Sequence, residues 1–108
     1  PMSSFDDREN AFENKFAHDA EMQFKAEARR NKLLGLWAAD LMGLAGDDAA
    51  KYAKSVVLSD LEEVGHEDVF RKVRKDFDDK GIDRTDVQIR SQMTELLPIA
   101  REQLQNEA

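Results

Sequence analysis

The segment "EDVFRKVRKDFDD", residues 67–79, decides the fold class of this 108-residue chain. Its apolar residues recur at helical spacing among charged neighbours: Val69, Phe70, Val73 and Phe77. A helix with about 3.6 residues per turn gathers these side chains on one side. The segment is therefore predicted to be an amphipathic helix that packs against other helices.

Glycines divide the chain on the N-terminal side of this helix. The sequence "GLAGDD", residues 43–48, offers a helix end at Gly43 and an N-cap at Asp47, and Gly65 offers the next end. A helix is predicted over about residues 48–64. Its buried face would be formed by Tyr52, Ala53, Val56, Val57 and Leu61.

Another predicted helix follows Gly81 and covers about residues 86–106. Asp83 or Thr85 can cap this helix. Thr85 and Gln88 have the spacing of a capping box, in which each side chain accepts from the other's backbone N–H. Pro98 interrupts the apolar pattern of this helix. Because proline removes a helical hydrogen bond, a kink or a break is expected near Leu97.

The first 43 residues contain no proline after position 1 and no glycine before Gly35. Ser3 or Ser4 can cap a helix there, so helical propensity is continuous over some 35 residues. Two apolar blocks lie within it: Leu33, Leu34, Trp37, Leu41 and Leu44, and, further upstream, Phe5, Phe12 and Phe16. A straight helix would join the blocks through Gln23, Glu27 and Arg30, which are unsuited to a core. Docking is therefore expected only from about Phe24 or Lys32 onward.

A short helix that cannot bury its apolar face is marginal in water. We therefore expect residues 1–19 to be a mobile arm, disordered until it binds a partner, and residues 20–108 to be an all-α four-helix bundle. Two alternatives are that the three phenylalanines extend the core of the bundle, or that they form an interface between two copies of the chain.

The composition limits the classes of partner. The formal net charge is −7 and the pI about 4.8, so nucleic acid and anionic lipid surfaces are poor candidates. The chain has no cysteine, which excludes disulfides and thiolate chemistry. The uncharged run at residues 33–39 is far shorter than the roughly 20 residues of a membrane span. A single cytoplasmic domain is expected.

Few residues point to chemistry. His18 and His66 are far apart and lack the spacing of metal ligands, so neither a metal site nor a catalytic site is predicted. His18 is a candidate pH-sensitive element, because a histidine can change its charge near neutrality. The alternative is that protonation of a solvated histidine has little effect.

The basic cluster in "KAEARRNK" lies within the first predicted helix and contains Lys25, Arg29, Arg30 and Lys32. The simplest interpretation is a solvated helix face. The functional alternatives are an acidic protein partner or a nucleotide phosphate, with weak binding of ATP or ADP.

The chain resembles the alphaproteobacterial zeta subunit, the inhibitor of the F1 part of ATP synthase. The resemblance rests on "FDDRENAFENKFAHDAEMQFKAEARRNKLLGLWAADLMGLAG" and "YAKSVVLSDLEEVGHEDVFRKV", and continues more loosely to the C-terminus. It implies a non-enzymatic inhibitor, monomeric when free and peripheral to the inner membrane, with a four-helix bundle. Its N-terminal segment would become helical in a catalytic α/β interface of F1, reach toward the γ subunit and block hydrolytic rotation.

On this chain the resemblance places the inhibitory segment at about residues 2–19. Phe5, Phe12 and Phe16 would be its apolar anchors. Its polar binding residues would be Arg8, Glu9, Glu13, Lys15 and His18. No cofactor is required. The alternative function is a helical module that senses adenine nucleotide through the basic cluster and has no strong inhibitory activity.

Overall fold

The computed structural model describes residues 4–61 and 65–108, and all regular structure within them is helical. The helices are α1 (Ser4–Leu41), α2 (Gly46–Ser59), α3 (Glu67–Lys80) and α4 (Asp86–Glu107). Contacts join α1 to each of the other three helices. The predicted all-α chain of four helices is confirmed.

Helix α1 is continuous over 38 residues, and this corrects the expectation of a flexible N-terminal arm. Residues 4–19 are ordered in the same helix as the docked residues that follow. The expectation treated this segment as an isolated helix, which would have to nucleate by itself. As an extension of a packed helix it needs only propagation, which adds one hydrogen bond for each residue fixed.

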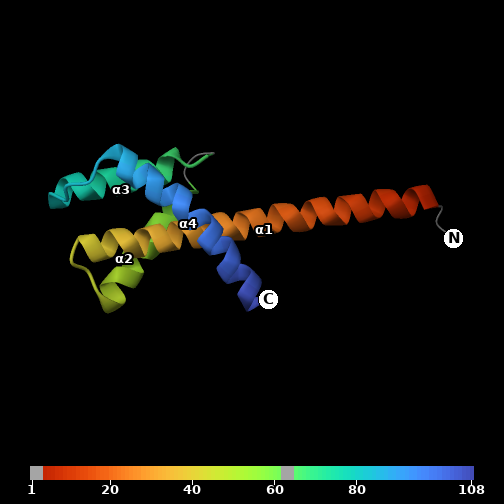
Figure 1. Ribbon diagram of the computed structural model, residues 1–108, viewed down its shortest axis with the longest axis horizontal. Helices are drawn as coiled ribbons and strands as arrows, with labels where there is room; N and C mark the ends of the chain where they lie inside the picture. Colours follow the sequence, from red (N-terminus) through yellow and green to blue (C-terminus); the bar gives the residue numbers. More distant parts are fainter. Residues whose placement is uncertain (1–3, 62–64) are drawn as a thin grey trace.

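The molecule is elongated, with extents of 65 × 26 × 21 Å. Figure 1 shows the N-terminal half of α1 extending beyond the other three helices, which gather around its C-terminal half. Ala26 is the first buried residue of α1, as expected for docking from about Phe24 onward. We call the four packed helices, from residue 26 onward, the body.

The core of the body draws residues from all four helices: Leu34, Ala38, Val56, Val69, Phe70, Val73, Phe77, Ile89 and Met93. The stripe predicted on residues 67–79 supplies four of these. Trp37 packs at the edge of the core, with its ring centroid 5.6 Å from that of Phe77. The apolar block in the C-terminal half of α1 therefore anchors that helix as expected.

Small residues let α1 and α2 approach closely. A Cβ atom placed on Gly35 would lie 2.6 Å from the Cα of Ala53, which is closer than real Cβ contacts allow. Gly35 therefore has a packing role in the middle of a helix, where glycine is otherwise unfavourable by roughly 1 kcal/mol relative to alanine.

Two predicted helix ends are confirmed. Gly81 follows α3 in the left-handed conformation, with φ of 69°, which glycine adopts without a steric penalty. Thr85 caps α4: its hydroxyl accepts from the backbone N–H of Gln88 at 3.1 Å, and the Gln88 side chain accepts from the Thr85 N–H at 2.8 Å.

Other details differ from the prediction. The N-cap of α2 is Ala45 and not Asp47, which lies in the first turn, where a carboxylate is favoured by the helix dipole. Helix α2 ends at Ser59, so Leu61 is exposed instead of belonging to its buried face. Helix α4 continues through Pro98, so the predicted break is wrong, whereas the predicted kink near Leu97 stays a prediction. Thr94, whose carbonyl loses its partner there, is solvent-exposed.

Candidate functional site

The most prominent surface feature is a row of phenylalanines on the projecting half of α1. Phe5, Phe12 and Phe16 are 75%, 71% and 68% exposed. At about 100° per residue they lie within an arc of about 40° on the helix surface. We call these three residues the Phe stripe. Burying such rings is favourable, so the stripe has the character of a protein-binding surface.

The polar residues predicted to accompany the stripe are all exposed. Arg8, Glu9 and Glu13 lie on the same projecting half of α1. Lys15 forms an ion pair with Asp19 one turn later, with an Nζ–Oδ2 distance of 2.9 Å. Such a pair supports the helix modestly in water. His18 is also exposed and lies where the projecting half meets the body.

Polar residues separate the Phe stripe from the core, on the helix face that the sequence analysis identified. Gln23 donates to Glu27 Oε1 at 2.9 Å and accepts from Arg101 of α4 at 3.1 Å. Glu27 lies 3.6 Å from Nε2 of His66. The stripe and the core thus share one face of α1 without forming one apolar surface.

Arg30 belongs to this face, and the expectation that it is unsuited to a core is wrong. Arg30 is only 4% exposed. Its Nε donates to Asn31 Oδ1 at 2.8 Å, and its Nη1 to the carbonyl of Met93 at 3.3 Å. Nη2 lies 3.1 Å from His66 Nδ1. Because a guanidinium only donates, His66 accepts here through Nδ1.

A side-chain amide connects the guanidinium of Arg30 to a carboxylate. Asn31 is fully buried and donates from Nδ2 to Asp60 Oδ2 at 3.1 Å. Burial lowers the pKa of Arg30, while the carboxylates of Asp60 and Glu27 act in the opposite direction. Hydrogen bonding makes this burial tolerable, since an unpaired buried charge would be very costly. The network joins α1 to α4 and to residues beside α2 and α3.

Sequence reasoning missed the roles of Asn31, Asp60 and His66. One signal was present for Asn31, because it precedes Leu34 by three residues and Ala38 by seven. Residues at that spacing share a helix face. Asp60 and His66 flank the link between α2 and α3, and no helical spacing places them beside Arg30.

The four residues of the basic cluster are not brought together. Lys25 pairs with Glu21 at 2.9 Å. Arg29 pairs with Glu107, donating from Nη1 at 2.7 Å. Arg30 is buried and Lys32 is exposed. The arrangement offers no convergent set of free cations for a phosphate, and binding of ATP or ADP stays a prediction.

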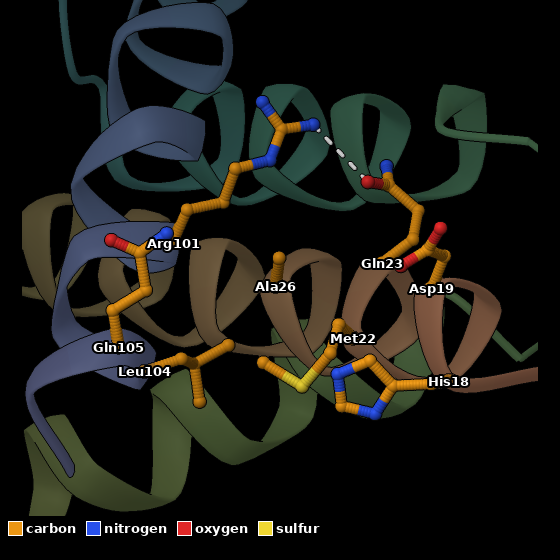
Figure 2. A pocket seen from close by; sticks show the side chains of 8 residues that line it. All are labelled: His18, Asp19, Met22, Gln23, Ala26, Arg101, Leu104 and Gln105. Carbon is orange, nitrogen blue, oxygen red and sulfur yellow. Dashed lines mark hydrogen bonds between the residues drawn. The ribbon is translucent and has the colours of Figure 1, made fainter. Parts of the chain in front are cut away.

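A pocket of about 340 Å³ opens where the projecting half of α1 meets the end of α4. Figure 2 shows side chains from both helices around it, with Arg101 reaching across to Gln23. We call it the junction pocket. Its lining residues are His18, Asp19, Met22, Gln23, Ala26, Arg101, Leu104 and Gln105.

Among the described residues, none of the helices is long and apolar enough to cross a membrane. Within the same residues, no group of three or more histidine, aspartate or glutamate side chains is arranged to hold a metal ion.

Comparison with known families identifies the chain. The family model for ATPase inhibitor subunit zeta matches residues 2–103. The chain belongs to the ATPase inhibitor subunit zeta family. This family comprises inhibitor subunits and not catalytic enzymes. Membership implies inhibition of F1-ATPase, and with it binding to F1-ATPase and association with ATP synthase.

A solved structure supports the fold of this zeta-family chain. It is a protein determined by NMR in solution, 52% identical, with a TM-score of 0.73. The match covers 81% of this chain and 99% of that one. A search of curated proteins finds no significant match.

Proposed function

We propose that this zeta-family chain inhibits F1-ATPase by inserting the projecting half of α1 into a catalytic α/β interface. The inserted helix reaches toward the γ subunit and blocks rotation driven by ATP hydrolysis. The body remains outside the groove. It holds the helix at its base through the core and through the network around Arg30.

The observation that carries this proposal is the Phe stripe. Three large rings within a narrow arc stay exposed on a helix that extends beyond its own body. An amphipathic helix placed in an apolar groove is a recurrent mode of protein recognition. Arg8, Glu9, Glu13 and Lys15 flank the rings and would set register and salt dependence.

The energetics of the stripe suit reversible binding. Full burial of each ring supplies roughly 1.5–3 kcal/mol. Association costs at least about 4 kcal/mol in lost freedom of motion. Because α1 is already helical through residue 4, little further backbone ordering is needed on binding. A preformed helix therefore keeps more of the burial energy as affinity than a disordered arm would.

The proposal is tested with purified F1 containing the α, β and γ subunits, by measuring ATP hydrolysis against inhibitor concentration. The variant combines Phe12→Ala with Phe16→Ala. We expect inhibition to weaken by about a hundredfold or more, because two buried rings are lost. The melting temperature should not fall, because both rings are exposed in the free chain.

Phe24→Ala is the matched control. Phe24 is also exposed, at 64%, but it lies about 80° around the helix from Phe16. We expect this variant to inhibit like the unmodified chain. Equal potency of the double variant and the unmodified chain would contradict the proposed mechanism.

A further inference from the structure

We propose that the junction pocket receives an acidic side chain of F1 and thereby fixes how deeply the helix inserts. This inference rests on the proposed function, because it concerns the same interface. The pocket lies at the base of the projecting helix: His18 and Met22 follow Phe16 by two and six residues. A groove that encloses α1 as far as Phe16 brings its rim against this pocket.

The chemistry of the pocket favours a carboxylate. Arg101 donates to the neutral Gln23 at 3.1 Å, and it forms no ion pair with a carboxylate of the described residues. Four other arginines of the body each pair with a carboxylate: Arg29 with Glu107, Arg71 with Asp68, Arg74 with Asp78 and Asp86, and Arg90 with Glu67. Arg30 and Arg84 also form no ion pair with a carboxylate of the described residues, but they donate to other groups of the body. Of these three arginines, Arg101 is the one that lines the junction pocket.

The remaining lining suits the stem of an acidic side chain. Met22, Ala26 and Leu104 supply apolar surface, and the Met22 side chain can adapt its shape. Asp19 also lines the pocket, but Lys15 pairs with it at 2.9 Å. A volume of about 340 Å³ is at the low end for small-ligand sites. A side chain from the rim of the groove would fit within it and occupy part of it.

The expected contact is a bidentate ion pair between Arg101 and the carboxylate of F1. A guanidinium presents parallel N–H groups that match the two oxygens of a carboxylate. The incoming carboxylate would replace the neutral amide of Gln23 as the acceptor for Arg101. Since the pocket lies at the base of the projecting half of α1, this ion pair would form when the Phe stripe is fully inserted and would prevent deeper insertion.

The test compares Arg101→Glu with Lys54→Glu in the F1 hydrolysis assay. Both change the net charge equally, and both side chains are exposed, but Lys54 lies on α2, away from the pocket. We expect Arg101→Glu to weaken inhibition by about tenfold or more, because it places like charges together. Lys54→Glu should leave inhibition unchanged. Circular dichroism on heating should show that both variants stay folded.

A crosslink identifies the occupant independently. The chain has no cysteine, so Gln105→Cys provides a single attachment point for a photo-crosslinker at the pocket wall. In the inhibited complex of this chain with F1, we expect a crosslink to an F1 peptide that contains Asp or Glu. Absence of an F1 crosslink, or a crosslinked peptide without an acidic residue, would overturn the inference.

The outcomes separate this inference from the function on which it rests. If the unmodified chain and Arg101→Glu inhibit equally, while Phe12→Ala with Phe16→Ala does not inhibit, the junction pocket has no such role and the stripe keeps its own. If the unmodified chain fails to inhibit F1, the proposed function and this inference are both overturned.

Discussion

At the scale of residues, Arg30 shows how a buried charge can link four helices. Its guanidinium bonds to a neighbouring amide, to a carbonyl of α4 and to the histidine before α3. The amide of Asn31 carries the contact on to Asp60. The network occupies the helix face that would otherwise continue the Phe stripe into the core. It thereby separates the Phe stripe, which we propose binds F1, from the apolar surface of α1 that packs in the core.

Replacing Arg30 with Met should destabilise the body by about 2–4 kcal/mol, because it leaves the partly buried Asp60 carboxylate without its counter-charge. Chemical denaturation measures the effect as a lower midpoint. Lys32→Met, an exposed change two residues away, should shift stability by less than about 0.5 kcal/mol. Equal midpoints for both variants would show that the network does not stabilise the fold.

Glu107 should make the stability depend on pH. Its hydrogen bond with Arg29 lowers the pKa of the Glu107 carboxyl. A lowered pKa in the folded state adds stability above the unfolded value of about 4.3, and this is lost as the pH falls through the folded value. Glu107→Gln should therefore melt slightly below the unmodified chain at neutral pH.

That difference should disappear in acid, once the carboxyl is protonated in both states. Melting curves over a pH series measure it, and Glu102→Gln on the same helix is the control. The effect should be small because Glu107 is exposed. A melting difference that persists unchanged in acid would contradict an electrostatic origin.

At the scale of helices, the packing of α1 on α2 depends on Gly35. Gly35→Ala should lower the melting temperature, with a cost of about 1–3 kcal/mol, because the new methyl group would collide with the Ala53 backbone. In an exposed helix the same substitution would stabilise by roughly 1 kcal/mol. A lowered melting temperature would therefore support the close approach of α1 to α2, and a raised melting temperature would contradict it.

Local patterns predicted much of the fold. The stripe of α3, its glycine end and the capping box of Thr85 each depend on residues within a few positions of one another. The order of the N-terminal half of α1 depends instead on the docked half of the same helix. The early end of α2 at Ser59 was missed because residues 60 and 61 continue a helical pattern.

The candidate site was predictable only in part. The spacing of Phe5, Phe12 and Phe16 predicted one helix face, and the structure places all three on the surface. The junction pocket joins residues about 80 positions apart, such as Met22 and Leu104. Which faces of α1 and α4 meet is set by tertiary packing, so no local spacing in the sequence predicts this pocket.

At the scale of the whole molecule, the folded core and the proposed binding surface use different parts of α1. The buried core begins at Ala26 and extends to Ala100, while the Phe stripe lies entirely upstream. Removal of residues 1–17 should therefore leave the body folded, with its melting temperature nearly unchanged. Circular dichroism of the shortened chain measures this directly, and loss of the cooperative transition would contradict the division.

The most direct test of the central claim uses this shortened chain as an inhibitor. ATP hydrolysis by F1 is measured with the full chain and with the chain that lacks residues 1–17. We predict that the full chain inhibits and the shortened chain does not, because the Phe stripe is gone while the body is intact. Equal inhibition by both would contradict the claim and assign the inhibitory surface to the body.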